Sequence, residues 1–331
     1  MGHLLSKPVT DIETTSGQNS KYRVGSSCMQ GWRSTMEDTH TQLLSLPEDP
    51  NAAFFGVFDG HGGDNVAKYA KEHLHKFVIK QDAYKDADVE QALKAGFLDI
   101  DDALRKNETW SAQIIGTTAV VVLIKDNVLY CANAGDSRCI ACVNGELELL
   151  SVDHRPDNVT EMQRIQAAGG WVRFNRVNNN ITISRAIGDF YYKSSKEDPQ
   201  LQLVTAYPDV EVRKITKDYE FILLACDGIW DVMSNMEVLE FCRTRIGLGK
   251  LPEEICEDLL KHCLAPDTPT RSQGTDNMTV ILICLLNENP YSYLINRCKP
   301  RINTNDLVED IQVNVALPDM PLLDMSEDTT V

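Results

Sequence analysis

Acidic residues border apolar stretches at five places in the sequence, and carboxylates placed in this way can bind metal ions. They are Glu37 with Asp38, Asp59, Asp136, Asp227 and Asp276. Burying a lone carboxylate is costly, so several at the ends of strands imply shared partners. A turn built on Asp explains any one of them but explains five poorly. An oxygen-rich set without a Cys or His cluster favours Mg²⁺ or Mn²⁺ over structural zinc.

The stretch around Asp59 carries the most chemistry in the fewest residues. Four apolar residues and a glycine, Phe54 to Phe58, lead directly into Asp59, Gly60 and His61. Gly60 lets the backbone approach closely, so its carbonyl is a candidate oxygen ligand beside Asp59. His61 can titrate near neutral pH. If the acidic strand ends converge, the sequence predicts a two-metal centre here.

Short apolar and β-branched runs predict the strands that must bring these groups together. The predicted strands are Tyr22 to Met29, Ala53 to Phe58, Ala119 to Ile124, Val128 to Ala134, Arg138 to Val143, Ile181 to Ser184, Phe221 to Cys226 and Met278 to Cys284. Several are joined by tight turns such as Asn144-Gly145. Turns of this length connect antiparallel neighbours, because parallel strands need a longer crossover.

Helices are predicted in a few blocks between the strands. Apolar residues recur at helical spacing over 66–78 and 89–104. A helix over 160–168 should end at Gly169-Gly170, and Ser234 with Glu237 forms a capping box before a helix that reaches Ile246. Pro252 suits the first turn of a last helix ending near Leu264. The order of elements predicts an α+β fold, a four-layer αββα sandwich in which two antiparallel sheets are flanked by pairs of helices.

Both ends of the chain are predicted to lie outside this fold. Residues 1–20 are polar and rich in turn formers, so we expect a flexible N-terminus and a folded domain over 21–290. Residues 291–331 carry three prolines and no sustained periodicity, which predicts a loosely attached or disordered C-terminal extension. The start of the chain, Met1-Gly2 with Ser6, fits N-myristoylation at Gly2, and the alternative is an ordinary unmodified N-terminus. One acyl chain gives only reversible membrane association.

Composition excludes several classes of protein. The chain has 331 residues, 43% of them apolar, and a formal net charge of −17. Its apolar runs are shorter than the roughly 20 residues that span a membrane. The negative charge and the lack of a basic stripe argue against nucleic acid as a partner, and so against a two-metal nuclease. Asp99 to Asp102 lacks the glycine and final glutamate of an EF-hand calcium loop.

Cysteines indicate a reducing compartment. Ten of them are scattered through apolar stretches, which predicts buried free thiols and a cytoplasmic protein, with the nucleus or a peripheral membrane position as further locations. Cys139 and Cys142 have the spacing of a redox pair but lie in a strand-like run, so a packed strand is the favoured interpretation.

Nine segments, taken in order, resemble the motifs of the metal-dependent protein serine/threonine phosphatases of the PPM (type 2C) family. They are 29–40 (MQGWRSTMEDTH), 58–63 (FDGHGG), 116–119 (GTTA), 134–138 (AGDSR), 153–156 (DHRP), 164–170 (RIQAAGG), 184–189 (SRAIGD), 225–231 (ACDGIWD) and 275–280 (TDNMTV). Any one is weak evidence, but nine in the family order over residues 22–286 leave little room for coincidence. The likeness is greatest to the animal alpha/beta-type enzymes and includes the Met-Gly start. A catalytically dead relative would lack a metal carboxylate, and none is missing.

The resemblance implies roles for the acidic residues. Asp59 would bridge two Mg²⁺ or Mn²⁺ ions, Glu37 and the Gly60 carbonyl would complete one site, and Asp227 with Asp276 the other. Asp38 would position the attacking water, and Asp136 with Asp227 resembles the pair that holds a weaker third metal. The substrates would be phosphoserine and phosphothreonine in proteins, hydrolysed by in-line attack of a water shared by the two ions without a covalent intermediate.

The remaining roles follow from side-chain chemistry in that context. The planar guanidinium of Arg33 suits a phosphate, and His61 is placed to protonate the departing oxygen as general acid. Residues 153–195 resemble the family's flap beside the catalytic cleft, and Arg185 within it is a candidate substrate-binding residue. Tyr191, Tyr192 and the polar run 193–198 are predicted to form a solvated loop. Thr117 departs conservatively from the family motif, and the protein is predicted to be a monomer.

Overall fold

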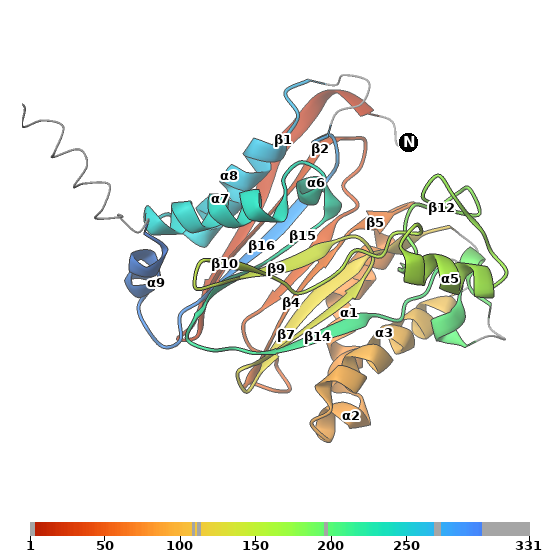
Figure 1. Cartoon of the computed structure of the whole chain (residues 1–331), viewed down its shortest axis with the longest axis horizontal. Helices are drawn as coiled ribbons and strands as arrows, with labels where there is room; N and C mark the ends of the chain where they lie inside the picture. The colour runs from red at the N-terminus through yellow and green to blue at the C-terminus, as the bar shows by residue number, and fades with distance from the viewer. Residues whose placement is uncertain (1–3, 108–109, 111–113, 195–197, 268–272, 300–331) are drawn as a thin grey trace, which may run out of the picture. The chain divides into compact units, whose positions relative to one another are not determined.

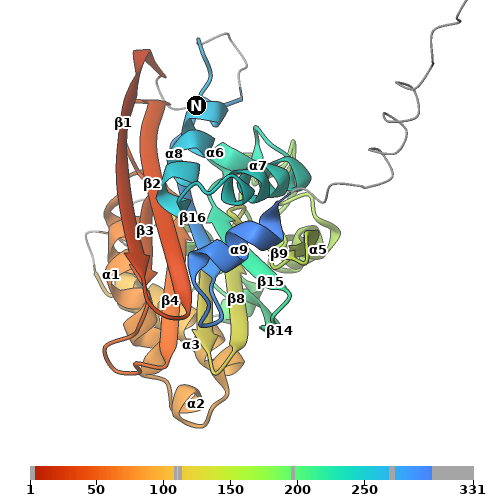
Figure 2. The same cartoon turned by 90° about the vertical axis from the view of Figure 1, so that its left-hand side faces the viewer.

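Two antiparallel β-sheets form the centre of the protein in the computed structural model. The structure describes residues 4–107, 110, 114–194, 198–267 and 273–299. The larger sheet has six strands in the order β1-β2-β16-β15-β9-β10, and the second has five in the order β14-β8-β7-β4-β3. Figure 1 shows helices α7 and α8 over the outer face of one sheet and α1 and α3 over the other, and Figure 2 shows the same layers from the side. The predicted four-layer sandwich is confirmed.

The elements have the following bounds. The six-stranded sheet contains β1 (Leu4–Gln18), β2 (Tyr22–Arg33), β16 (Met278–Leu285), β15 (Tyr219–Ala225), β9 (Arg138–Val143) and β10 (Glu146–Leu149). The five-stranded sheet contains β14 (Asp209–Lys214), β8 (Val128–Ala134), β7 (Ala119–Lys125), β4 (Ala52–Phe58) and β3 (Thr39–Leu43). A small sheet joins β13 (Ile187–Gly188), β6 (Gly116–Thr117) and β5 (Gly60–His61), and β11 (Val172–Arg173) pairs with β12 (Arg176–Val177). The helices are α1 (Asn65–Ile79), α2 (Asp82–Lys85), α3 (Val89–Arg105), α5 (Val159–Ala167), α6 (Asp227–Trp230), α7 (Asn235–Gly247), α8 (Pro252–Cys263) and α9 (Tyr291–Cys298), with 3₁₀ turns η1 (Phe190–Tyr192) and η2 (Pro199–Leu201).

The central strands are buried on both faces, which explains why they read as continuous apolar runs rather than as alternating patterns. Every residue of β4, β15 and β16 is buried. One hydrophobic core lies between the sheets and includes Phe55 and Ile222. A second lies under α1 and α3, and a third under α7, α8 and α9. Alternate residues of each central strand therefore face opposite sides. One set packs against the other sheet, and the other set packs under the helices.

The predicted helix ends are confirmed where a cap specified them. Ser234 accepts a hydrogen bond from the backbone of Glu237, whose side chain returns to the Ser234 backbone, so the capping box forms at the start of α7. Gly169 follows α5 in a left-handed conformation with φ 80°. Pro252 occupies the first turn of α8.

The prediction of a flexible N-terminus was wrong for residues 4–18. They form β1, which pairs antiparallel with β2 from Leu4↔Arg33 to Gln18↔Arg23. The strand is polar because it lies at an edge, and cross-strand pairs such as Thr15 Oγ1 with Ser26 Oγ, 2.7 Å apart, contribute to its stability. Apolar periodicity could not reveal a strand held in this way. Gly2 lies outside the described residues.

Two further predictions need correction. The fold continues past residue 290, because α9 buries Tyr291, Leu294 and Cys298 against the core under α7 and α8. The helix has only eight residues, so its apolar residues repeat too few times to show a helical pattern in the sequence. The run Ile181 to Ser184 is not a strand and makes only an isolated bridge at Ile181. Residues 300–331 lie outside the described part of the chain.

All ten cysteines are free and buried, as the sequence predicted. Cys139 belongs to the core between the sheets and Cys142 to the core under the helices, so the two side chains leave β9 on opposite faces. The redox interpretation is therefore excluded by the strand geometry. Among the described residues, no helix combines the length and the apolar character needed to cross a membrane.

Candidate active site

Carboxylates from both sheets meet at one cavity of about 590 Å³. Asp59 follows β4, Asp136 lies in the turn between β8 and β9, Asp227 opens α6 after β15, and Asp276 precedes β16. All four line the cavity together with Glu37, Gly60, Arg33 and His61. The predicted convergence of acidic strand ends is therefore observed, and it depends on the two sheets facing each other.

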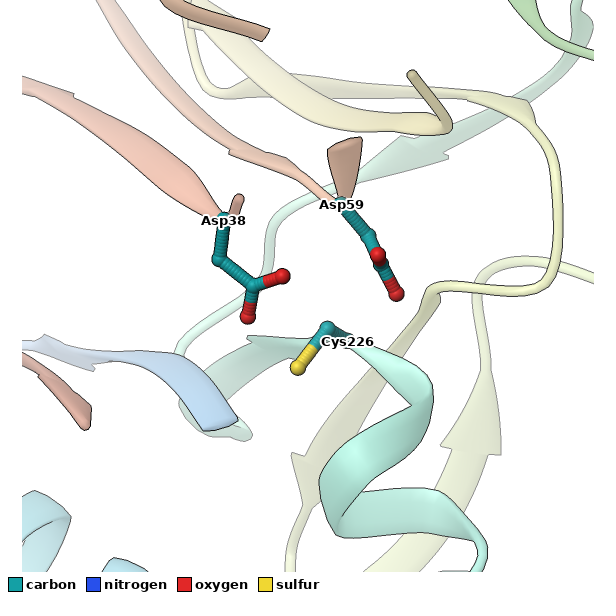
Figure 3. Close-up of side chains that lie close together, drawn as sticks. All are labelled: Asp38, Asp59 and Cys226. Atoms are coloured by element: carbon teal, nitrogen blue, oxygen red, sulfur yellow. The ribbon is translucent and has the colours of Figure 1, made fainter. Parts of the chain in front are cut away.

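Asp38 lies behind this cavity rather than on its wall. Its carboxylate is buried, and its Oδ2 accepts a hydrogen bond of 2.8 Å from Thr279 Oγ1. Ligand atoms of Asp38, Asp59 and Cys226 all lie within 4.8 Å of one another, and Figure 3 shows the three side chains close together. The Cys226 thiol, at the end of β15, was not predicted from the sequence to lie in this cluster.

The site concentrates negative charge in a buried place. Burial, followed by the neighbouring carboxylates, raises the pKa of Asp59 and of Asp227 well above the ordinary value. Burial is also the main cause that raises the pKa of Asp38 to about 7 and that of Asp136 to about 6. A group of carboxylates with raised pKa values is electrostatically unfavourable when all are ionised, and a bound cation relieves that repulsion. The oxygen donors fit a hard divalent ion such as Mg²⁺ or Mn²⁺.

Two glycines let the backbone segments of the site meet. A Cβ atom at Gly60 would lie 2.5 Å from the carbonyl oxygen of Glu37, and one at Gly228 would lie 2.0 Å from the carbonyl oxygen of Asn277. Neither distance is compatible with a side chain, so both positions require glycine for close approach. Gly60 therefore allows the end of the Asp59 strand to contact the loop that carries Glu37. Gly228 allows the segment that carries Asp227 to contact the segment that carries Asp276.

Asn277 connects the Glu37 loop to the start of β16, a role that the sequence analysis missed. Its Nδ2 donates to the backbone oxygens of Gln30 (2.8 Å) and Thr35 (3.0 Å), and its Oδ1 accepts from the backbone N–H of Glu37 (2.9 Å). One buried amide thus places Glu37 relative to Asp276. Its position directly after Asp276 in the chain was the only available signal.

Arg33, the last residue of β2, lies at the wall of the cavity as predicted. Its guanidinium forms an ion pair with the Asp276 carboxylate, and 38% of its side chain is exposed. The planar group has five N–H donors, so donors remain for a second anion.

His61 pairs with the buried carboxylate of Asp189, and this partner was not assigned a role from the sequence. His61 Nε2 lies 2.7 Å from Asp189 Oδ2, and Asp189 is fully buried. Burial alone lowers the pKa of His61, but the carboxylates of Asp189, Asp136 and Glu37 together raise it by more, and the net pKa lies above the usual value. A Cβ atom at Gly116 would lie 2.6 Å from Asp189 Oδ2 and 2.8 Å from His61 Nε2. Any side chain at residue 116 would therefore clash with the pair, and glycine provides the space that the two side chains occupy.

Arg185 does not lie among the residues that line the cavity, so the structure does not support its prediction as a substrate-binding residue. Its guanidinium is occupied by Glu161 Oε1 at 2.8 Å and by Asp209 Oδ1 at 2.7 Å, and Nη1 also donates to the Tyr207 carbonyl at 3.0 Å. Only 12% of the side chain is exposed. Arg185 instead ties α5 to the loop before β14.

This ion-pair network should make stability depend on acidity. Burial raises the pKa of Glu161, but Arg185 and Arg164 lower it by more, to about 2 from 4.5. The pair therefore stabilises the fold fully above about pH 4.5 and loses its contribution, of about 3 kcal/mol, as pH falls toward 2. We expect Glu161→Gln to be less stable than wild type in urea at pH 7 and to approach it at pH 3. A stability difference that does not change between these pH values would contradict the assignment.

The comparisons with known proteins agree with this geometry. The family model for protein phosphatase 2C matches residues 22–271. The chain belongs to the protein phosphatase 2C family. A probable protein phosphatase 2C of Caenorhabditis elegans is 51% identical over 312 residues, which cover 94% of this chain and 88% of that protein. Protein phosphatase 2C homolog 3 of Schizosaccharomyces pombe is 46% identical over 310 residues, 92% of this chain and 75% of that protein.

A solved structure confirms the fold of this protein phosphatase 2C family member. The serine-threonine phosphatase 2C of Toxoplasma gondii has a TM-score of 0.70 with 23% sequence identity, covering 82% of this chain and 99% of that one. The family resemblance inferred from the nine motifs is confirmed by the family model and by the relatives from Caenorhabditis elegans and Schizosaccharomyces pombe.

Proposed function

We propose that this protein phosphatase 2C family member hydrolyses phosphoserine and phosphothreonine in proteins with the help of Mg²⁺ or Mn²⁺. The observation that carries the proposal is the meeting of Asp59, Asp227, Asp276 and Glu37 at one cavity with Arg33 and His61 on its wall. These carboxylates and the Gly60 carbonyl would hold two ions, and Asp136 with Asp227 would hold a weaker third. Bound ions of this kind supply Lewis-acid chemistry that makes water nucleophilic at neutral pH and offsets charge on the phosphoryl oxygens.

The protein groups divide the remaining work. Arg33 donates hydrogen bonds to two phosphoryl oxygens and so fixes the phosphate in the cavity. Asp38, whose carboxylate accepts hydrogen bonds from Thr279 and from the Cys226 thiol behind the cavity, would help to position the attacking water. Asp189 holds Nε2 of His61, so Nδ1 is the ring nitrogen that donates a proton to the departing seryl or threonyl oxygen. Acylation of Gly2, a monomeric state and a cytoplasmic location are parts of the proposal that rest on the sequence alone.

The direct test uses the purified full chain and a phosphothreonine peptide. We expect release of inorganic phosphate with Mn²⁺ or Mg²⁺ and none after chelation, and we expect calorimetry to detect binding of Mn²⁺ without substrate. A folded protein that binds Mn²⁺ but releases no phosphate would contradict the proposal.

Removing Arg33 should weaken binding of the phosphate. Hydrogen bonds to charged groups contribute about 1.5–3 kcal/mol, so we expect Arg33→Ala to raise KM for the peptide by about 10- to 100-fold. The inhibition constant of inorganic phosphate should rise by a similar factor, and Arg33→Lys should fall between the two because it keeps the charge without the planar fork. If Arg33→Ala alters the affinity for Mn²⁺ and leaves phosphate inhibition unchanged, Arg33 acts on Asp276 instead.

A further inference from the structure

Lys193 and Asp101 form an ion pair in the interior, although the sequence predicted that residues 193–198 form a solvated loop. Lys193 Nζ lies 2.7 Å from Asp101 Oδ1, and the two side chains are 1% and 9% exposed. Burial raises the pKa of Asp101 and lowers that of Lys193, so each charge depends on the other. A buried ion pair often contributes little to net stability, because desolvation offsets the attraction. The hydrogen bonds around the pair indicate that it holds a segment of backbone in place.

The same carboxylate holds both ends of the segment that contains Asp189. Asp101 Oδ1, on α3, also accepts a hydrogen bond of 2.7 Å from the backbone N–H of Gly188. Lys193 Nζ donates a second hydrogen bond, 2.8 Å long, to the carbonyl of Ala186. Residues 186–193 are therefore closed into a loop by one ammonium group and fixed to α3 by one carboxylate.

Asp189 sits inside this loop in a backbone conformation that needs support. Its φ and ψ are 54° and 43°, in the left-handed region that non-glycine residues adopt at a cost, and Gly188 before it has φ 92°. Such a conformation persists when the surrounding structure determines it. Two hydrogen bonds hold the backbone in this conformation. Gly188 N–H donates to Asp101, and Asp189 N–H donates to the carbonyl oxygen of Ile115 at 2.8 Å.

The side chain of Asp189 has little else to orient it. Its Oδ2 contacts His61 Nε2, and among the described residues its Oδ1 has no hydrogen-bond partner. The direction of the carboxylate therefore depends on the backbone of residues 188–189 and on the packing around the buried side chain. Anything that moves this backbone also moves the group that orients the His61 ring.

We infer that Asp101 and Lys193 are positioning residues for the general acid. They hold Gly188 and Asp189 so that Asp189 keeps His61 aligned with the leaving oxygen. The inference rests on the proposed function, because it assumes that His61 donates a proton. Neither residue touches the substrate, and their effect passes through the backbone at Gly188.

Two double variants separate positioning from simple loss of charge. Asp101→Leu with Lys193→Met removes both buried charges at similar volume, which proteins often tolerate, and it also removes the acceptor for the Gly188 N–H. Asp101→Asn with Lys193→Met removes the same charges but keeps an acceptor oxygen at that place. Each is assayed with Mn²⁺ on a phosphothreonine peptide, whose leaving oxygen needs a proton, and on p-nitrophenyl phosphate, whose leaving group does not.

We expect the Leu/Met variant to lose about 10- to 100-fold in kcat on the peptide, as general acid catalysis and its alignment contribute factors of this size. Its kcat on p-nitrophenyl phosphate should stay within about 3-fold of wild type, and the Asn/Met variant should recover most of the peptide activity. In metal-free protein, the proton between His61 Nε2 and Asp189 should give a downfield resonance in proton NMR that the Leu/Met variant lacks and the Asn/Met variant retains.

A matched control removes another buried charge far from the site. Glu220 is 1% exposed and pairs with Arg243 at 2.8 Å, and it lies six residues along β15 from Cys226, about 20 Å away. Glu220→Gln should lower the melting temperature and leave the ratio of the two activities unchanged. Equal losses on both substrates in the Leu/Met variant, or a wild-type ratio with the NMR signal retained, would overturn the inference.

His61→Ala distinguishes this inference from the proposed function. If His61→Ala lowers peptide hydrolysis selectively and the Leu/Met variant does not, the positioning inference fails and the proposed function stands. If His61→Ala itself lowers both activities equally, the general-acid role in the proposed function fails, and the inference fails with it.

Discussion

Asp59→Asn should remove metal-dependent phosphatase activity and at the same time make the metal-free protein more stable. Asp59 lies where β4 ends, and the pKa of its carboxyl is raised by burial and then by Asp38, Asp227, Asp276 and Asp136. An amide of the same size removes one charge from this repelling group. It also replaces the anionic carboxylate of Asp59, one of the groups that would hold the proposed ions, by a neutral amide, which should cost several kcal/mol of transition-state stabilisation, or about 10³-fold in kcat/KM.

The two effects predict an inversion that a melting experiment can detect. Without metal, Asp59→Asn should melt at a higher temperature than wild type. With saturating Mn²⁺, wild type should melt higher, because a ligand that binds only the folded state stabilises it and the variant binds that ligand weakly. Asp102→Asn makes the same charge change at an exposed position on α3, where Asp102 pairs with Lys106, and should alter neither curve. If the variant melts below wild type without metal, the carboxylates do not repel one another as inferred.

The acidic strand ends could be predicted because each leaves a local signal. Asp59 and Asp227 directly follow runs of apolar residues, and Asp276 lies two positions before one. Strands buried on both faces produce such runs, and a charge can appear only where the strand leaves the core. Gly60 and Asn277 also lie next to these residues in the chain, although only Gly60 was singled out.

Contacts between distant segments could not be predicted in the same way. Asp189 reaches His61 across 128 positions of sequence, and Lys193 reaches Asp101 across 92. A polar run such as 193–198 has the composition of a solvated loop whether or not its first lysine is buried. Likewise β1 is polar because it pairs at an edge, and its partner β2 determines it more than its own pattern does. The sequence thus indicates which groups do chemistry more readily than which groups position them.

Gly228→Ala should damage the site through the backbone alone. A Cβ atom at residue 228 would lie 2.0 Å from the carbonyl oxygen of Asn277 and 3.1 Å from its carbonyl carbon. No rotamer of alanine can relieve this contact, so the start of α6 and the segment before β16 must separate. We expect a loss of about 3 kcal/mol in the free energy of unfolding, at the upper end of the range for overpacked sites. The affinity for Mn²⁺ should fall by about 10- to 100-fold, as it does when supporting groups of a metal site are lost.

The loss of Mn²⁺ affinity should be specific to Gly228, and a second closely packed glycine, Gly247, provides the control. A Cβ atom at Gly247, at the end of α7, would lie 2.7 Å from the carbonyl oxygen of Cys298. Gly247→Ala therefore also forces two backbones apart, but between α7 and α9. It should lower the free energy of unfolding and leave the Mn²⁺ affinity unchanged in calorimetry. If Gly228→Ala is destabilised to the same degree and still binds Mn²⁺ like wild type, Asp227 and Asp276 do not hold an ion together. A selective loss would mean that the close contact of α6 with β16, and not the carboxylates alone, makes the site.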